Sequence, residues 1–243
     1  MSSQSHSGRR AKVAGLLAAV AAAVGMAVGV PAHAQALPCL GSGSADLFCP
    51  RPQLSAFPGQ QINSGNSRCS VGVTGDIAGR RYAVTAGHCY KPGMTVTDRG
   101  GTRLGRYEFG VPDHTGTDEF GFGVIRLSDN VNTSASLGGQ SLESINFNPQ
   151  VGQELCKVGS TTGRTCGRIT QVTPRHIYAD LYGDHGDSGG VVYTITPTGQ
   201  AAFVGIVIAK FERRVGLIIE PASVLLNTIN RHSTDGPFRI HTR

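Results

Sequence analysis

The chain has 243 residues, few of them charged, with 34 glycines and no tryptophan. This composition is typical of a globular protein, and the length allows one domain, or two small ones, with a sizeable core. The formal net charge of +6 comes without any run of Lys or Arg, so the sequence gives no basis for a nucleic-acid-binding protein.

The N-terminal segment has the pattern of a signal peptide. A basic start precedes an apolar run at 13–30, and Ala32 and Ala34 follow at the spacing of a signal-peptidase site. The run is long enough for a membrane anchor, but its Ala/Gly-rich composition and processing pattern favour cleavage after Ala34. We therefore predict a signal peptide at 1–34 and a secreted, extracellular protein that is not attached to a membrane after cleavage.

All six cysteines follow the predicted cleavage site, and an even number in an exported chain predicts three disulfides. Six cysteines allow 15 connectivities. Proximity in the sequence favours Cys39–Cys49, Cys69–Cys89 and Cys156–Cys166. Because no C-x-x-C pair is present, we expect no zinc site, and nothing in the sequence indicates a cofactor.

The remaining chain is predicted to be all-β. Residues 35–59 are rich in Pro, Gly and Ser and indicate an irregular N-terminal arm. From residue 60 onward, short runs rich in β-branched residues recur between turn residues, as in "RYAVTA", "FGVIRL" and "FVGIVIA", which is typical of a sandwich or barrel. Only "EPASVLLNTINR" near the end predicts a helix. We place the main domain at 60–235 and a C-terminal tail at 236–243.

Two short stretches indicate nucleophilic catalysis. The stretch "GDHGDSGG" at 183–190 presents Ser188 among glycines, and a serine hydroxyl needs an adjacent base to act as a nucleophile. The stretch "YAVTAGHCY" supplies His88 directly after an apolar strand. A disulfide at the neighbouring Cys89 would hold the turn of this base.

"TAGHC" and "GDSGG" resemble the motifs of the chymotrypsin-like serine peptidases, and they occur in that family's order. "SGNSRCSVGV" and "CKVGSTTGRTCG" are similar to the bacterial streptogrisin and alpha-lytic branch. The resemblance covers about 60–230. It implies two packed six-stranded antiparallel β-barrels with a short C-terminal helix, and a monomeric secreted endopeptidase that cleaves protein or peptide substrates through an acyl-enzyme.

The resemblance also assigns roles around Ser188. The N–H groups of Gly186 and Ser188 would form the oxyanion hole, which stabilises the negative charge that develops during the reaction. Asp187 would be a buried partner that holds the turn. Gly189 and Gly190 would allow a substrate backbone to approach closely.

The acid of the triad departs from the family pattern. Counting back from "FGVIRL" places Gly121 where the family has Asp. We predict that Asp118 reaches His88 through a β-bulge, with Glu119 as the alternative. If neither carboxylate did so, the chain would be a weak enzyme or a secreted binding protein that kept the fold without turnover.

The substrate pocket departs as well. Tyr182 stands where trypsin-like members carry Asp, and Ile208 to Lys210 replace a strand that usually begins with Ser and ends with Gly. A buried unpaired cation is costly. We therefore expect small or acidic residues to be preferred over Arg or Lys at P1, the residue on the amino side of the cleaved bond. Pocket residues would be Tyr182, Ile208 and Lys210.

Overall fold

The computed structural model describes residues 53–114, 119–211 and 215–243. Within these ranges it has seventeen strands, one α-helix and one 3-10 turn, so the all-β prediction is confirmed. The expected signal peptide and the Cys39–Cys49 disulfide lie outside the described residues.

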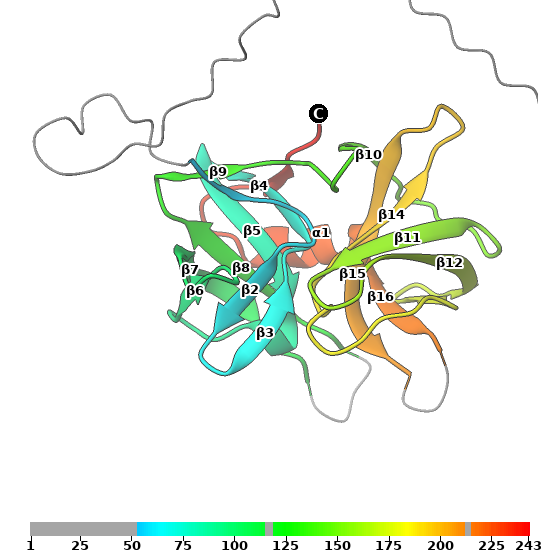
Figure 1. Cartoon of the computed structure of the whole chain (residues 1–243), viewed down its shortest axis with the longest axis horizontal. Coiled ribbons are helices and arrows are strands. Elements are labelled where there is room, and N and C mark those ends of the chain that lie inside the picture. Colours follow the sequence, from blue (N-terminus) through cyan, green and yellow to red (C-terminus); the bar gives the residue numbers. More distant parts are fainter. Residues whose placement is uncertain (1–52, 115–118, 212–214) are drawn as a thin grey trace, which may run out of the picture. The chain divides into compact units, whose positions relative to one another are not determined.

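Strands of the first half, together with the C-terminal strand β17, form an eight-stranded sheet in the order β17-β4-β5-β8-β7-β6-β2-β3. Its strands are β2 (Gln61–Ser64), β3 (Ser67–Ser70), β4 (Val73–Ile77), β5 (Arg80–Ala86), β6 (Thr95–Thr97), β7 (Arg103–Val111), β8 (Phe122–Leu127) and β17 (Arg239–Ile240). Figure 1 shows strands β2 to β8 of this sheet grouped on one side of the molecule. The β4–β5 hairpin turns at Ala78 and Gly79, whose φ values of 48° and 76° fit a two-residue turn that matches the strand twist.

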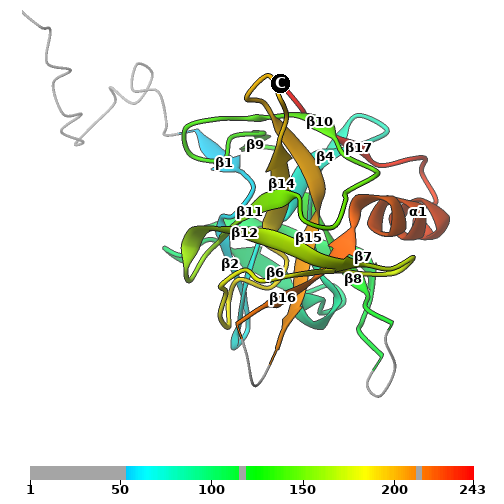
Figure 2. The same ribbon diagram turned by 90° about the vertical axis from the view of Figure 1, so that its right-hand side faces the viewer.

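The second half closes into a six-stranded barrel, because β15 pairs with both β14 and β16. Its strands are β11 (Glu154–Gly159), β12 (Gly163–Val172), β13 (Ile177–Ala179), β14 (Val191–Ile195), β15 (Ala201–Lys210) and β16 (Leu217–Pro221). A further strand, β10 (Leu142–Ile145), pairs in parallel with β15. The two halves lie beside each other (Figures 1 and 2), and one cluster of buried side chains includes residues of both.

Two segments are more ordered than the sequence predicts. Most of the expected arm at 35–59 lies outside the described residues, but its last part forms β1 (Leu54–Ala56), which pairs in parallel with β9 (Val131–Thr133). The expected tail at 236–243 contains β17, which pairs with β4. β17 thus adds a strand to the eight-stranded sheet beyond the predicted domain boundary, while β1 forms a separate two-stranded sheet with β9.

The predicted helix is confirmed as α1 (Ala222–His232), which directly follows β16 (Figure 2). Its buried residues are Ala222, Leu225 and Ile229, which recur at the spacing of one helical face. Within the described ranges, no helix has both the length and the apolar character needed to cross a bilayer.

Two of the predicted disulfides are present. Cys69 on β3 is bonded to Cys89, and Cys156 on β11 is bonded to Cys166 on β12. The first bond ties β3 to the turn that contains His88, and the second joins two neighbouring strands of the second barrel.

Candidate active site

His88 lies in a tight turn at the end of a buried strand. The last five residues of β5 are buried, and the strand leads into the 3-10 turn Gly87–Cys89. The disulfide from Cys89 fixes this turn to β3. The side chain of His88 remains 40% exposed, so the fold holds the backbone of the histidine while leaving its ring accessible.

The carboxylate that contacts His88 belongs to Asp113. Its Oδ2 lies 2.8 Å from His88 Nδ1, and its Oδ1 accepts a hydrogen bond of 2.8 Å from the N–H of Gly121. Gly87 makes this approach possible, because a Cβ atom there would lie 2.3 Å from Asp113 Oδ1. The pairing leaves Nε2 of His88 available for proton transfer.

The predicted acid, Asp118, lies outside the described residues, so its role stays a prediction. Within the described ranges, the carboxylate at Nδ1 of His88 is that of Asp113. The alternative, Glu119, forms an ion pair of 2.9 Å with Arg175 instead. All three acids lie between β7 and β8 in the sequence, but Asp113 is close to the end of β7, whereas the predicted acids are close to the start of β8.

Gly121 lets the end of β7 come close enough for Asp113 to contact His88. A Cβ atom at Gly121 would lie 1.8 Å from the carbonyl oxygen of Val111, so the absence of a side chain lets the end of β7 close against β8. Asp113 then reaches His88 from the segment that follows β7, and Gly121 donates its N–H to the Asp113 carboxylate.

Ser188 lies in a turn fixed from several directions. Asp187 N–H donates to Asp184 O at 2.9 Å, and Gly190 N–H donates to Asp187 O at 2.8 Å. The carbonyl oxygen of Ser188 accepts a hydrogen bond of 2.8 Å from Ser70 N–H on β3, which joins the turn to the other half of the molecule. Within the described part of the chain, the N–H groups of Gly186 and Ser188 donate to no other residue.

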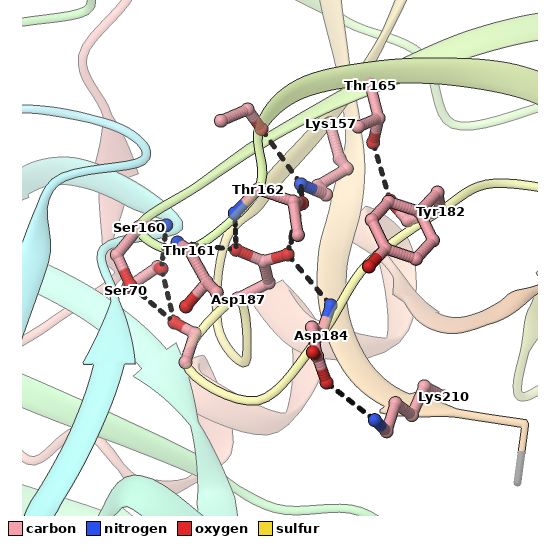
Figure 3. A network of polar contacts seen from close by, with 12 residues as sticks. Ser70, Lys157, Ser160, Thr161, Thr162, Thr165, Tyr182, Asp184, Asp187 and Lys210 are labelled. Atoms are coloured by element: carbon pink, nitrogen blue, oxygen red, sulfur yellow. Dashed lines mark hydrogen bonds and ion pairs between the residues drawn. The ribbon is translucent and has the colours of Figure 1, made fainter.

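Asp187 is 1% exposed and is surrounded by hydrogen-bond donors (Figure 3). Its carboxylate accepts from the hydroxyl of Thr162 at 2.6 Å and from three backbone N–H groups, those of Thr161, Thr162 and Asp184. Burial by itself would raise the pKa of Asp187, but these hydrogen bonds outweigh burial and hold the pKa below its usual value. The predicted role of Asp187 as a buried partner of the turn is confirmed.

The counter-charge of Asp187 is Lys157 on β11, which the sequence analysis missed. Lys157 is fully buried, and its Nζ lies 3.1 Å from Asp187 Oδ2 and 2.8 Å from the carbonyl oxygen of Gly163. Burial lowers the pKa of Lys157, although the charge of Asp187 opposes this change. A single lysine within the strand "ELCKVG" was the available signal, because buried lysines require a partner.

A pocket of about 370 Å³ opens between His88 and Ser188. Its lining residues are His88, Asp184, His185, Ser188, Val207, Ile208, Ala209, Lys210 and Leu217. Ile208 and Lys210 are therefore at the pocket as predicted. Tyr182 is not among these lining residues, and it is 54% exposed. Lys210 Nζ lies 2.6 Å from Asp184 Oδ1, so the pocket wall carries an ion pair.

One group of potential metal ligands occurs in the described ranges: Cys69, His88 and Cys89. The two cysteines are joined in a disulfide, so they have no thiolate to offer a metal.

Comparisons of the sequence with known proteins agree on one family of serine peptidases. The sequence profile of the family described as Trypsin matches residues 56–218. A protein of Mycobacterium tuberculosis named "Uncharacterized protein Rv1815" is 32% identical over 192 residues, covering 72% of this chain and 83% of that protein. Glutamyl endopeptidase 2 of Streptomyces griseus is 32% identical over 126 residues, covering 50% of this chain and 65% of that protein.

Solved structures agree on the fold. Thermobifida fusca Protease A matches with a TM-score of 0.60 at 20% identity, covering 78% of this chain and 100% of that one. Another match is a serine protease described as glutamic acid specific and as using a histidine triad in substrate binding. It has a TM-score of 0.57 at 26% identity, and the match covers 69% of this chain and 94% of that one.

A second buried carboxyl group lies near Asp113. Glu220 on β16 is 3% exposed, and its Oε2 has no hydrogen-bond partner among the described residues. Burial, and to a smaller extent the charge of Asp113, raises the pKa of Glu220 to about 8. The folded protein therefore keeps Glu220 protonated at pH values where an unfolded chain would ionise it.

This difference predicts a pH-dependent stability. Above the ordinary glutamate pKa of 4.5, the unfolded chain releases the proton while the folded chain retains it, so the free energy of unfolding should fall as the pH rises toward 8. The fall contributed by this group should be at most about 1.4 kcal/mol per pH unit. Glu220→Gln should remove it, and urea unfolding at pH 5, 6, 7 and 8 measures the difference.

Glu154→Gln is the matched control, because the Glu154 side chain is 66% exposed. The wild type and this control should share one pH profile, with Glu220→Gln gaining stability relative to both as the pH rises. Parallel profiles for all three proteins would show that Glu220 ionises normally in the fold.

Proposed function

The chain belongs to the trypsin family of serine endopeptidases, and we propose that it cleaves protein or peptide substrates through Ser188, His88 and Asp113 with an acyl-enzyme intermediate. The observation that carries this proposal is the hydrogen bond between Asp113 and Nδ1 of His88, beside a pocket that His88 shares with Ser188. A carboxylate on Nδ1 fixes the tautomer in which Nε2 is the base.

The steps follow from these positions. Ser188 Oγ attacks the peptide carbonyl carbon while Nε2 of His88 takes the hydroxyl proton, and Asp113 stabilises the resulting imidazolium. The N–H groups of Gly186 and Ser188, which have no other acceptor in the described structure, would receive the oxyanion. Collapse of this intermediate breaks the peptide C–N bond, and His88 returns the proton to the leaving amine. Water then releases the acyl group by the same route.

The alternative function, a binding protein without turnover, had its main support in the missing acid at Gly121. Asp113 supplies a carboxylate to the same histidine nitrogen. That contact favours catalysis.

Secretion and activation are part of the proposal. The signal-peptide pattern at 1–34 and the two described disulfides support export to an oxidising compartment. Because Lys157 already neutralises Asp187, the Ser188 turn requires no newly freed N-terminal amine as a counter-charge. We expect a monomer without a cofactor or nucleic-acid partner.

The pocket supports an acidic or small P1 residue. Asp184 is the acidic residue in the pocket lining, but its carboxylate is paired with Lys210, so a basic P1 residue would have to compete with that lysine. An acidic P1 residue would instead meet Lys210. The two relatives whose names describe cleavage at glutamate favour the acidic residue.

The nucleophile is tested by Ser188→Ala. This variant should lose peptide hydrolysis and should no longer be labelled by a serine-directed phosphonate, because the attacking hydroxyl is gone. The wild-type protein should show both activities. Retained turnover in Ser188→Ala would exclude the acyl-enzyme mechanism.

The acid is tested by comparing two neighbouring aspartates. Asp113→Asn should lower kcat by about 10⁴, because an amide stabilises the wrong tautomer of the histidine. Asp118→Asn is the matched control and should retain near wild-type kcat. The opposite ranking in a steady-state assay would return the role to Asp118.

Specificity is tested with a peptide library and two pocket variants. Asp184→Asn releases Lys210 and should increase cleavage after Glu or Asp, whereas Lys210→Met should decrease it, each by about tenfold or more in kcat/KM, the effect of one charged hydrogen bond. Dominant cleavage after Arg or Lys by the wild type would overturn this preference and make Asp184 the pocket acid.

A further inference from the structure

We propose that Thr161 and Arg68 are positioning residues that clamp the His185–Gly186 peptide in the orientation needed for an oxyanion hole. This inference rests on the proposed function, because it concerns how one of the two oxyanion donors is aimed. Neither residue would touch the substrate carbonyl. They come from different halves of the molecule, Thr161 from the turn between β11 and β12 and Arg68 from β3.

The clamp acts on the carbonyl group of His185. That oxygen accepts a hydrogen bond of 2.7 Å from Thr161 Oγ1 and one of 3.3 Å from Arg68 Nη2. A trans peptide is planar, so the C=O of His185 and the N–H of Gly186 point in opposite directions. Holding the carbonyl toward Thr161 and Arg68 therefore turns the N–H of Gly186 away from them.

A clamp is needed because Gly186 allows other orientations. Its φ of +100° lies in the region that favours glycine. A Cβ atom at this position would lie 2.4 Å from Thr161 Oγ1 and 2.8 Å from Arg68 Nε. The position thus needs a glycine to admit the two clamping side chains, and the same glycine gives the peptide little intrinsic preference for one orientation.

The next peptide is fixed separately. The carbonyl oxygen of Gly186 accepts hydrogen bonds from the hydroxyls of Ser70 at 2.7 Å and Ser160 at 2.8 Å. With the following peptide held in this way, the His185–Gly186 peptide is the remaining unit able to rotate. Its orientation therefore depends on the groups bound to the His185 carbonyl.

Thr161 also connects the clamp to the buried acid. Its backbone N–H donates to Asp187 Oδ1 at 2.9 Å while its hydroxyl holds His185. One residue thus fixes both sides of the turn that carries Ser188. The side-chain contact can be removed without disturbing the backbone contact, which makes the clamp testable by substitution.

Thr161→Val is the main test, because it keeps the backbone N–H and the branched shape but removes the hydroxyl. We expect kcat for a peptide substrate to fall about fivefold to tenfold, the effect of one lost hydrogen bond, with KM changed less than twofold. Affinity for a peptide aldehyde, whose adduct places an oxyanion in the hole, should fall by the same factor as kcat/KM. Thr161→Ser should restore both values.

Two further variants separate the clamp from general stability. Thr170→Val removes another exposed threonine hydroxyl that donates to a backbone carbonyl, that of Tyr178 at 3.2 Å, and should leave kcat unchanged. Arg68→Met removes the second donor and should lower kcat in the same direction. If Thr161→Val does not fold, Arg68→Met with the aldehyde measurement decides the question.

The outcomes distinguish this inference from the proposed function. If the wild type hydrolyses peptides and Ser188→Ala does not, but Thr161→Val and Arg68→Met keep wild-type kcat and aldehyde affinity, the clamp is rejected and the peptidase function stands. A rise in KM with unchanged kcat would also reject it, because it would indicate a role in substrate binding. A wild type without hydrolysis or phosphonate labelling would reject the peptidase function itself.

Discussion

The active-site turn depends on one buried ion pair, that of Lys157 and Asp187. Two charges removed from water are tolerated only when their remaining hydrogen-bonding capacity is satisfied, and here Thr162 and three backbone N–H groups complete the shell of the carboxylate. Removing either partner would leave a buried charge, at a cost of about 3–5 kcal/mol. The pair therefore restricts the chain around Ser188 to a single arrangement.

The same turn is also where the two halves of the molecule are joined. Ser70 on β3 donates its N–H to the carbonyl of Ser188 and its hydroxyl to that of Gly186. Gly189 lies so close to β5 that a Cβ atom would be 2.1 Å from Thr85 Oγ1. The relative position of the nucleophile and the histidine is thus set by backbone contacts between the halves, and small residues are required where the two meet.

Local sequence signals were sufficient for most of the strands, the helix and the two described disulfides, and they drew attention to His88 and Ser188. Alternation and turn residues act over a few positions, and "GDSGG" and "TAGHC" each encode a complete local turn. Local sequence signals did not predict contacts that depend on how distant segments of the chain are aligned in the fold. Asp113 reaches His88 because β7 ends against Gly121, and Lys157 pairs with Asp187, which lies thirty positions further along the chain. Tyr182 was misplaced for a similar reason, because neighbouring positions in a turn do not reveal which side chain faces a pocket.

The position of Asp113 has a consequence for how catalytic competence is judged across exported proteins. A classification that requires each catalytic residue at its usual sequence position would treat Gly121 as the loss of the acid. It would place this sequence among inactive relatives. A carboxylate supplied by the segment that follows β7 can serve the histidine equally well, since the ring responds to where the charge lies and not to which position in the chain carries it.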